Sequence, residues 1–441
     1  MKLTSFIQET FMDAIKTLTS KEGIKNLYRT SLYRNAVYLM FNSVVLAATG
    51  FFFWMVAARF YSTEGVGLSS AAISAMRLLA MLSTLGLDYG LIRFLPAAKD
   101  KSRDMINSCF TIGVTVSVGL SLVFLAGVGF WSPRLLLIRA HPIFFTAFII
   151  FTVGITLQTF TQQIFIAKRK AEFTLAQGLS FGLLRFIPLI ILVNFFQTFG
   201  IFISWGSTVL VVVAVAIIFL FPKVQTGYFP FPRIRKEVIN DILHFSAANY
   251  TASIFWAIPG FVLPLMVVNL LGAEQNAYFY IGWSIGNILS VVPAAASLSL
   301  FAEGSYNEER LVQEVKRSFK LILVILIPAI IIILPMANKI LLLFGQAYSK
   351  NATKLVWILA ISALPLSINY LYFSIRRVKK KMRNVIGLSG FIAVFTLGLT
   401  YVLLPQVGII GAGIAWLFSQ GVAAIFIMRN LFRNRSEVKP E

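Results

Sequence analysis

Two arginines lie inside long apolar segments of the sequence, where a charged side chain needs a cavity or a partner. Arg77 is near the middle of the apolar stretch 66–88, and Arg185 is near the middle of 173–195. A cation at the centre of a bilayer costs roughly 2.5–3.5 kcal/mol on insertion scales, so it rarely faces lipid. A guanidinium also binds a phosphate through a planar pair of donors. The two arginines therefore predict an electropositive cleft for a phosphate or diphosphate.

Other polar residues could complete this cleft. On a helical wheel of 100° per residue, Ser70, Arg77, Thr84 and Asp88 fall on nearly one face of their segment. Asp88 is expected to be an ion-pair partner at the cytoplasmic gate rather than a proton carrier. The alternative is that Arg77 pairs with Asp88 or with helix carbonyls and only locks helices together. Further candidate substrate-binding residues are Gln158, Gln162 and Asn287.

The segments that carry these side chains have the composition of membrane-spanning helices. The chain is 58% hydrophobic and only 13% charged, with a mean hydropathy of +0.81, unlike a soluble domain. Twelve apolar stretches are each near 20 residues, the length that crosses a bilayer as a helix, so the sequence predicts an all-α polytopic membrane protein. The stretches are predicted at 36–58, 66–88, 106–130, 142–166, 173–195, 201–221, 244–268, 276–300, 319–338, 355–374, 385–404 and 408–428.

Several other classes of protein are disfavoured by what the sequence lacks. The net charge of +22 could suggest a nucleic-acid partner, but the basic residues lie in short loops and no nucleic-acid-binding motif is present. The single cysteine, Cys109, excludes an internal disulfide. There is neither a phosphate-binding GxxxxGK[ST] loop nor a carboxylate-rich outer loop. We therefore expect no cofactor, no metal and no enzymatic activity.

The distribution of basic residues predicts the orientation. Of the 39 lysines and arginines, 31 lie in the two tails and in alternate loops, and 6 lie in the other loops. Basic loops stay on the cytoplasmic side of a membrane, so both termini are predicted to be cytoplasmic in a plasma or inner membrane. Residues 1–35 have apolar residues at helical spacing and are predicted to form an amphipathic helix on the membrane lipids.

The second half of the chain repeats the first at an offset near 210 residues. This offset places Glu64 on Glu274, and Asn287 falls at the position equivalent to Arg77. Each half has six spans, and an even number returns the chain to the side of the membrane on which it started. Both halves therefore begin on the same side and should be related by a pseudo-two-fold axis along the membrane normal. The predicted domains are an amino-terminal segment at 1–35, an N-lobe at 36–221, an inter-lobe linker at 222–243, a C-lobe at 244–428 and a basic tail at 429–441.

The order of spans and turns resembles the polysaccharide (oligosaccharidyl-lipid) flippases of the multidrug/oligosaccharidyl-lipid/polysaccharide exporter superfamily. The resemblance covers most of the chain after residue 30 and is a diffuse pattern of hydropathy and turns. It rests on the stretches AARFYSTEGVGLSSAAISAMRLLAMLSTLGLDYGLIRFLP at 57–96, IFIAKRKAEFTLAQGLSFGLLR at 164–185, YFYIGWSIGNILSVVPAAASLSLFAE at 278–303 and ILLLFGQAYSKNATKLVWILAISALP at 340–365.

The resemblance implies a V-shaped pair of six-helix bundles around a central cavity that opens alternately to the two sides. It implies transfer of a polyprenyl- or dolichyl-linked (di)phosphate oligosaccharide to the outer leaflet, by a monomer that could associate with polysaccharide-assembly enzymes. The energy could come from an ion gradient or the membrane potential. Cavity arginines of the first lobe bind the lipid-linked phosphate in related flippases. By position, the residues that match this role are Arg77, Arg185, Arg93 and Arg34.

Two other functions remain open from the sequence. A cation-coupled multidrug and toxin exporter of the same superfamily would need a carboxylate at mid-membrane depth, and the sequence places none there. A membrane polymerase or transferase acting on lipid-linked sugars would need essential polar residues in large outer loops, whereas the predicted outer loops are short.

Overall fold

The computed structural model describes residues 31–98, 101–225, 227–306 and 311–433, and nearly all of them are helical. Twelve helical segments in this part of the chain are long and apolar enough to cross a membrane, as predicted. Most of the predicted surface helix at 1–35, and residues 434–441 of the tail, lie outside the described residues. The first half contains α3 (Ser31–Phe60), α4 (Thr63–Ser83), α5 (Leu87–Phe94), α6 (Ser102–Ala126), α7 (Val128–Trp131), α8 (Leu136–Ala140), α9 (Pro142–Ala167), α10 (Ala171–Leu184), α11 (Phe186–Leu192), α12 (Gly200–Val215) and α13 (Phe221–Val224).

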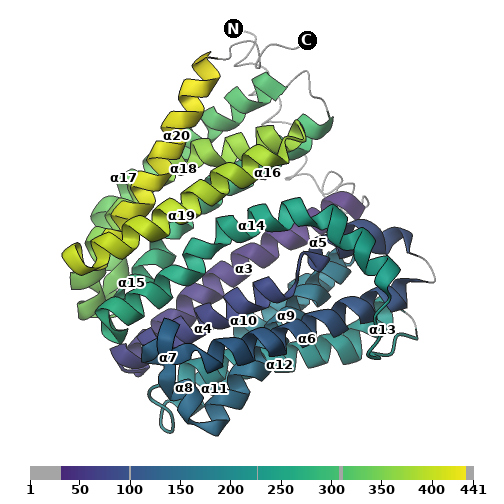
Figure 1. Cartoon of the computed structure of the whole chain (residues 1–441). Helices are drawn as coiled ribbons and strands as arrows, with labels where there is room; N and C mark the ends of the chain where they lie inside the picture. Colours follow the sequence, from purple (N-terminus) through teal and green to yellow (C-terminus); the bar gives the residue numbers. More distant parts are fainter. Residues whose placement is uncertain (1–30, 99–100, 226, 307–310, 434–441) are drawn as a thin grey trace, which may run out of the picture.

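The second half has longer helices and fewer breaks. Its helices form the C-lobe, and Figure 1 shows α16 to α20 as one group beside the group formed by α4 to α13. We call the end of the molecule at which α3 begins and α20 finishes the inner end, in keeping with the predicted orientation. The C-lobe helices are α14 (Lys236–Leu271), α15 (Ala273–Gly286), α16 (Val291–Tyr306), α17 (Leu311–Leu342), α18 (Gln346–Val378), α19 (Met382–Val407) and α20 (Ile410–Arg433).

The second predicted span is not one helix, and this corrects the helical-wheel argument. The structure ends α4 at Ser83 and begins α5 at Leu87. Between them Leu85 and Gly86 have φ angles of 50° and 79°, in the left-handed region that ends a helix. Asp88 therefore lies on α5, not on the helix that carries Arg77.

The fifth span is also broken, at one of the two arginines. Arg185 lies between α10 and α11. Pro188 follows three residues later and has no N–H to donate to the carbonyl of Leu184, which weakens the helix at this point. Ser204 on α12 donates a hydrogen bond to the Arg185 carbonyl oxygen at 2.8 Å. This bond attaches the break to the neighbouring helix and fixes the position of Arg185.

Helix α4 lies at the centre of the molecule and positions Arg77. Its outer half consists mainly of small residues that are fully buried, including Gly67 and Ala71. Small side chains allow neighbouring helices to approach closely inside a membrane, and α4 packs against α9, α14 and α15. Helices α3 and α17, by contrast, are mostly unburied along their apolar windows, as expected for helices that face lipid.

The outer ends of the two lobes are held together by hydrogen bonds. Asn276 on α15 donates to the Gly67 carbonyl oxygen at 2.8 Å and to the Ser70 hydroxyl at 3.1 Å. Arg59, at the end of α3, donates to the carbonyl oxygens of Leu342 and Leu343, both at 2.8 Å. These contacts close the outer side of the molecule between the lobes.

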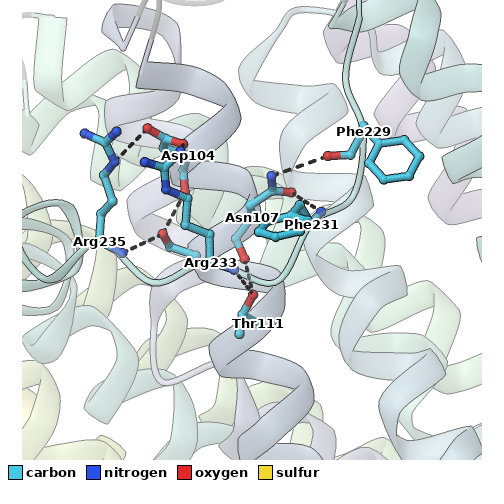
Figure 2. A network of polar contacts seen from close by, with 8 residues as sticks. Asp104, Asn107, Thr111, Phe229, Phe231, Arg233 and Arg235 are labelled. Atoms are coloured by element: carbon cyan, nitrogen blue, oxygen red, sulfur yellow. Dashed lines mark hydrogen bonds and ion pairs between the residues drawn. The ribbon is translucent and has the colours of Figure 1, made fainter.

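The inter-lobe linker lies along one face of α6 (Figure 2). Four polar side chains at helical spacing on α6 contact it. Asp104 forms ion pairs with Arg233 and Arg235 at 2.8 and 2.7 Å, and Asn107 accepts a hydrogen bond from the Tyr228 hydroxyl at 2.8 Å. The backbone N–H groups of Arg233 and Arg235 donate to Thr111 and Ser108 at 3.1 and 3.0 Å.

These contacts also explain how the linker is fixed without regular secondary structure. Burial raises the pKa of Tyr228, so its hydroxyl stays protonated and remains a donor. Together with the ion pairs of Asp104, this hydrogen bond attaches the linker up to Arg235 to α6 of the N-lobe. Helix α14 begins directly after Arg235.

Candidate functional site

A cavity of about 500 Å³ lies beside α4, and we call it the arginine cavity. Its walls come from α3, α4, α5, α9, α10 and α12 of the N-lobe, and from α14 and α15 of the C-lobe. The structure brings six of the predicted site residues to this one cavity, although they come from four segments: α4 with its C-cap, α5, α9 and the break between α10 and α11. They are Arg77, Thr84, Asp88, Gln158, Gln162 and Arg185.

The Arg77 guanidinium is free to bind a ligand. Its side chain is exposed to the cavity, and its charged carbon lies 5.2 Å from the ring centre of Phe261 on α14. Among the described residues it has neither an ion pair nor a hydrogen bond, so it is not locked to Asp88 or to a helix carbonyl in this conformation. Its donors are therefore available to an anion in the cavity.

Arg185 is held more rigidly than Arg77. Only 4% of its surface is exposed, and its guanidinium lies between two aromatic rings, 4.6 Å from the centre of Phe53 and 4.9 Å from that of Phe181. One nitrogen donates to the Thr49 hydroxyl at 3.3 Å. Its Nε is buried without a hydrogen-bond partner in the described structure. Stacking on the rings offsets part of the cost of burying the charge and fixes the charge at the wall of the cavity.

Asp88 is the acidic residue on the wall of the arginine cavity. It forms no ion pair with a described residue, so the predicted ion pair at the gate is not made in this conformation. One of its carboxylate oxygens is buried without a hydrogen-bond partner. Gln158 and Gln162 extend from α9 into the same cavity and add neutral donors and acceptors.

The remaining predicted residues lie away from the arginine cavity. Ser70 is fully buried and accepts the hydrogen bond from Asn276, because α15 covers α4 at that depth. Arg93 is exposed on α5, 5.8 Å from the ring centre of Phe245. Arg34 lies near the start of α3 and lines none of the described cavities.

A second cavity, of about 520 Å³, adjoins the first between the lobes, and we call it the aromatic cavity. Arg77 lines both cavities, as do Trp54, Phe261 and Tyr280. Asn287, at the repeat position of Arg77, lines the aromatic cavity only. Further rings in its wall are Phe51, Trp256, Trp283, Phe344, Tyr370 and Trp416.

Sequence reasoning missed the aromatic cavity, although one signal was present. Tryptophans of membrane helices usually lie at the helix ends, near the lipid headgroups. Trp256 and Trp283 instead lie well inside their membrane-spanning segments. Such positions indicate rings that face the protein interior or a cavity rather than the membrane interface.

Comparison with known proteins matches the chain to one protein family by sequence and to solved structures of one fold. A family model described as "Polysaccharide biosynthesis protein" matches residues 32–301. No curated protein matches the chain significantly.

Several solved structures share the two-lobed fold at low sequence identity. The lipid II flippase MurJ in its inward closed conformation aligns with a TM-score of 0.68 and 11% identity, over 90% of this chain and 87% of that one. An inward-facing multidrug resistance MATE family transporter of the MOP superfamily gives 0.66 and 15%, over 87% and 94%. A MOP superfamily transporter from Pyrococcus furiosus, described as having a binding pocket of reverse polarity, gives 0.63 and 15%, over 94% and 98%.

Proposed function

We propose that this chain, which belongs to the polysaccharide biosynthesis protein family, is a flippase for an isoprenoid-linked (di)phosphate oligosaccharide. It moves the substrate from the cytoplasmic to the outer leaflet by alternating access, and it is a transporter rather than an enzyme. The observation that carries the proposal is the unpaired guanidinium of Arg77, which lies where the two cavities meet.

The charges of the arginine cavity suit a diphosphate. Two guanidinium groups face one carboxylate there, so the cavity carries a net positive charge when Asp88 is ionised. Arg77 supplies a planar pair of donors to the phosphate oxygens. Arg185 adds a fixed positive charge in a region of low dielectric, where charge–charge attraction is stronger than in water. The isoprenoid chain stays in the lipid beside the lobes while the phosphate and sugar occupy the cavities.

The transport cycle follows from the contacts at the outer ends of the lobes. In the conformation described, Asn276 and Arg59 hold these ends together, so the substrate enters from the inner side. Release to the outer leaflet requires these hydrogen bonds to break and the inner ends to approach each other. We propose that both termini are cytoplasmic and that the protein resides in a plasma or inner membrane.

A second candidate is a cation-coupled multidrug exporter, which one observation favours. Asp88 places a buried carboxylate oxygen without a hydrogen-bond partner on the cavity wall. Such a group can bind a proton or attract a cationic drug. Against this, Arg77 and Arg185 line the same cavity and repel a cationic drug.

Equilibrium binding to the purified protein separates the two candidates. We expect polyprenyl diphosphate to bind the wild type, and Arg77→Ala to raise its dissociation constant by about 10- to 150-fold, because hydrogen bonds to charged groups contribute roughly 1.5–3 kcal/mol. Arg77→Lys should recover only part of this loss, since lysine lacks the planar pair of donors.

The matched control is Arg134→Ala, which removes an exposed arginine that lines neither cavity. Tight binding of a cationic dye, with no binding of polyprenyl diphosphate, would contradict the proposal and favour the exporter.

A further inference from the structure

We infer that the aromatic cavity binds the sugar portion of the substrate and selects saccharides that carry no charge. The inference rests on the proposed function, since it takes the phosphate to be held by Arg77. It adds a second subsite, formed largely by the C-lobe, with its own chemistry.

The rings of this cavity form a continuous, fixed cluster. Trp256 on α14 lies 5.0 Å from Tyr370 and 6.4 Å from Trp416, and Trp283 on α15 lies 5.3 Å from Trp416, all measured between ring centroids. The Trp256–Tyr370 and Trp283–Trp416 pairs meet edge to face, with planes at 71° and 68°, and the Trp256–Trp416 pair is tilted at 56°. Trp416 is almost fully buried, whereas Trp256, Trp283 and Tyr370 are only partly buried. The cluster therefore presents indole and phenol surface to the cavity on a rigid support.

Such surfaces fit the apolar side of a sugar ring. A pyranose has C–H groups that pack against an aromatic ring, while its hydroxyls project around the rim and need hydrogen-bond partners. Lipid tails need no such partners, so polar groups among the rings favour a sugar over a hydrocarbon chain.

The wall supplies polar groups of the required kind. The Ser284 hydroxyl donates to its own helix, to the Tyr280 carbonyl at 2.8 Å, and the Asn287 amide donates to the Trp283 carbonyl at 3.0 Å. The Ser284 donor and one of the two Asn287 amide hydrogens are therefore engaged, which leaves the Ser284 oxygen and the Asn287 side-chain carbonyl oxygen as acceptors. Sugar hydroxyls are donors that can satisfy both.

The charge of the cavity defines which sugars fit. Among the residues in its wall, Arg77 alone carries a charge, and it lies at the border with the arginine cavity. Once the diphosphate occupies Arg77, an acidic sugar among the rings would be desolvated without a counter-charge, which is costly. The aromatic cavity therefore favours neutral saccharides over uronic acids.

The experiment compares four probes on the purified full-length protein. These are polyprenyl diphosphate without sugar, the same lipid with a neutral disaccharide, the same lipid with a disaccharide ending in glucuronic acid, and the free neutral disaccharide. Stacking on fixed rings should make the neutral glycolipid bind the wild type about tenfold more tightly than the sugar-free lipid. The acidic glycolipid should gain little or nothing over the sugar-free lipid.

Two variants test whether the gain arises in this cavity. Trp283→Ala should abolish most of the tenfold gain and leave binding of the sugar-free lipid unchanged. Gly260→Phe fills the cavity from α14, where an added Cβ meets no atom within 4 Å, so it should fold and have the same effect. The matched control is Trp357→Ala. Trp357 is 41% exposed and lines none of the described cavities, so its loss should leave all four affinities unchanged.

The outcomes separate the sugar subsite from the proposed function. If the sugar-free lipid fails to bind while the free disaccharide binds in a Trp283-dependent manner, the phosphate site is wrong and the sugar site stands. Equal affinity for the neutral, acidic and sugar-free lipids would overturn the inference. The inference would also be overturned if both cavity variants weakened binding of the sugar-free lipid as much as binding of the glycolipid. The aromatic cavity would then bind the lipid chain or the diphosphate rather than the sugar.

Discussion

Closure of the outer side depends on a glycine where the two lobes touch. Gly67 on α4 lies against the start of α15, and a Cβ added there would overlap the carbonyl oxygen of Ala273. That oxygen belongs to the backbone and cannot move aside as the end of a flexible side chain could. We therefore predict that Gly67→Ala disfavours the outer-closed conformation described here and favours one in which α4 and α15 separate at their outer ends.

The size of the shift follows from the overlap. Overpacking of a close contact typically costs about 1–3 kcal/mol, which changes a two-state population by about 5- to 150-fold. The outward-open form loses no contact of its own, because the added methyl group faces space once the lobes part. Alanine also has a higher helix propensity than glycine, so the variant should fold as well as the wild type.

Labelling of a single introduced cysteine measures this shift. The native Cys109 is fully buried, so Ser284→Cys in the aromatic cavity becomes the reactive thiol. In sealed cells, a membrane-impermeant maleimide added outside should label this thiol about 5- to 150-fold faster when Gly67→Ala is present. The control is Gly398→Ala on α19, where an added Cβ meets no atom within 4 Å. Labelling of folded Gly67→Ala at the wild-type rate, or equal acceleration by Gly398→Ala, would refute the reasoning.

Three further predictions concern stability and topology. Arg185→Ala should destabilise the protein by about 2 kcal/mol or more, because it empties the space between two rings; an unchanged melting temperature in detergent would contradict this. Asp104→Asn should weaken both ion pairs of the linker, at 2.8 and 2.7 Å, by about 1 kcal/mol or less each because the arginines are partly exposed. Faster proteolysis at 225–235 would register that change, and a wild-type rate would count against it. A tag at either terminus should resist protease added outside sealed cells, and its cleavage would reverse the predicted orientation.

The membrane architecture could be predicted because it depends on local properties of the chain. Helices in a bilayer satisfy their own backbone hydrogen bonds, so length and hydropathy suffice to place them. The twelve spans and the two-lobed fold are confirmed on this basis. The break after α4 could not be placed, because one glycine in an apolar stretch is compatible with a continuous helix. In the structure the left-handed Gly86 lies against Tyr250, which is far away in the sequence, and an added Cβ would come within 2.9 Å of the Tyr250 side chain.

The sequence predicts only those residues of the candidate site whose type is unusual for a membrane-spanning helix. An arginine in an apolar span is conspicuous, so Arg77 and Arg185 were identified from the sequence. Ser70 shares a helical-wheel face with Arg77, but nothing in the sequence indicates that α15 covers α4 at that depth. The aromatic cavity depends on the docking of α14, α15, α18 and α20, and rings of the same types pack the cores of both lobes. Only their arrangement in space distinguishes a cavity wall from a core.

Transfer of lipid between leaflets tests the central claim most directly. Proteoliposomes containing the wild type, Arg77→Ala or Arg134→Ala would receive a fluorescent polyprenyl-diphosphate saccharide, and a quencher outside would report the fraction in each leaflet over time. The account predicts rapid transfer by the wild type and Arg134→Ala, and a rate at least tenfold lower for Arg77→Ala. Transfer by folded Arg77→Ala at the wild-type rate would contradict the role of this arginine. Failure of the folded wild type to move the lipid, even with an ion gradient supplied, would contradict the proposed function itself.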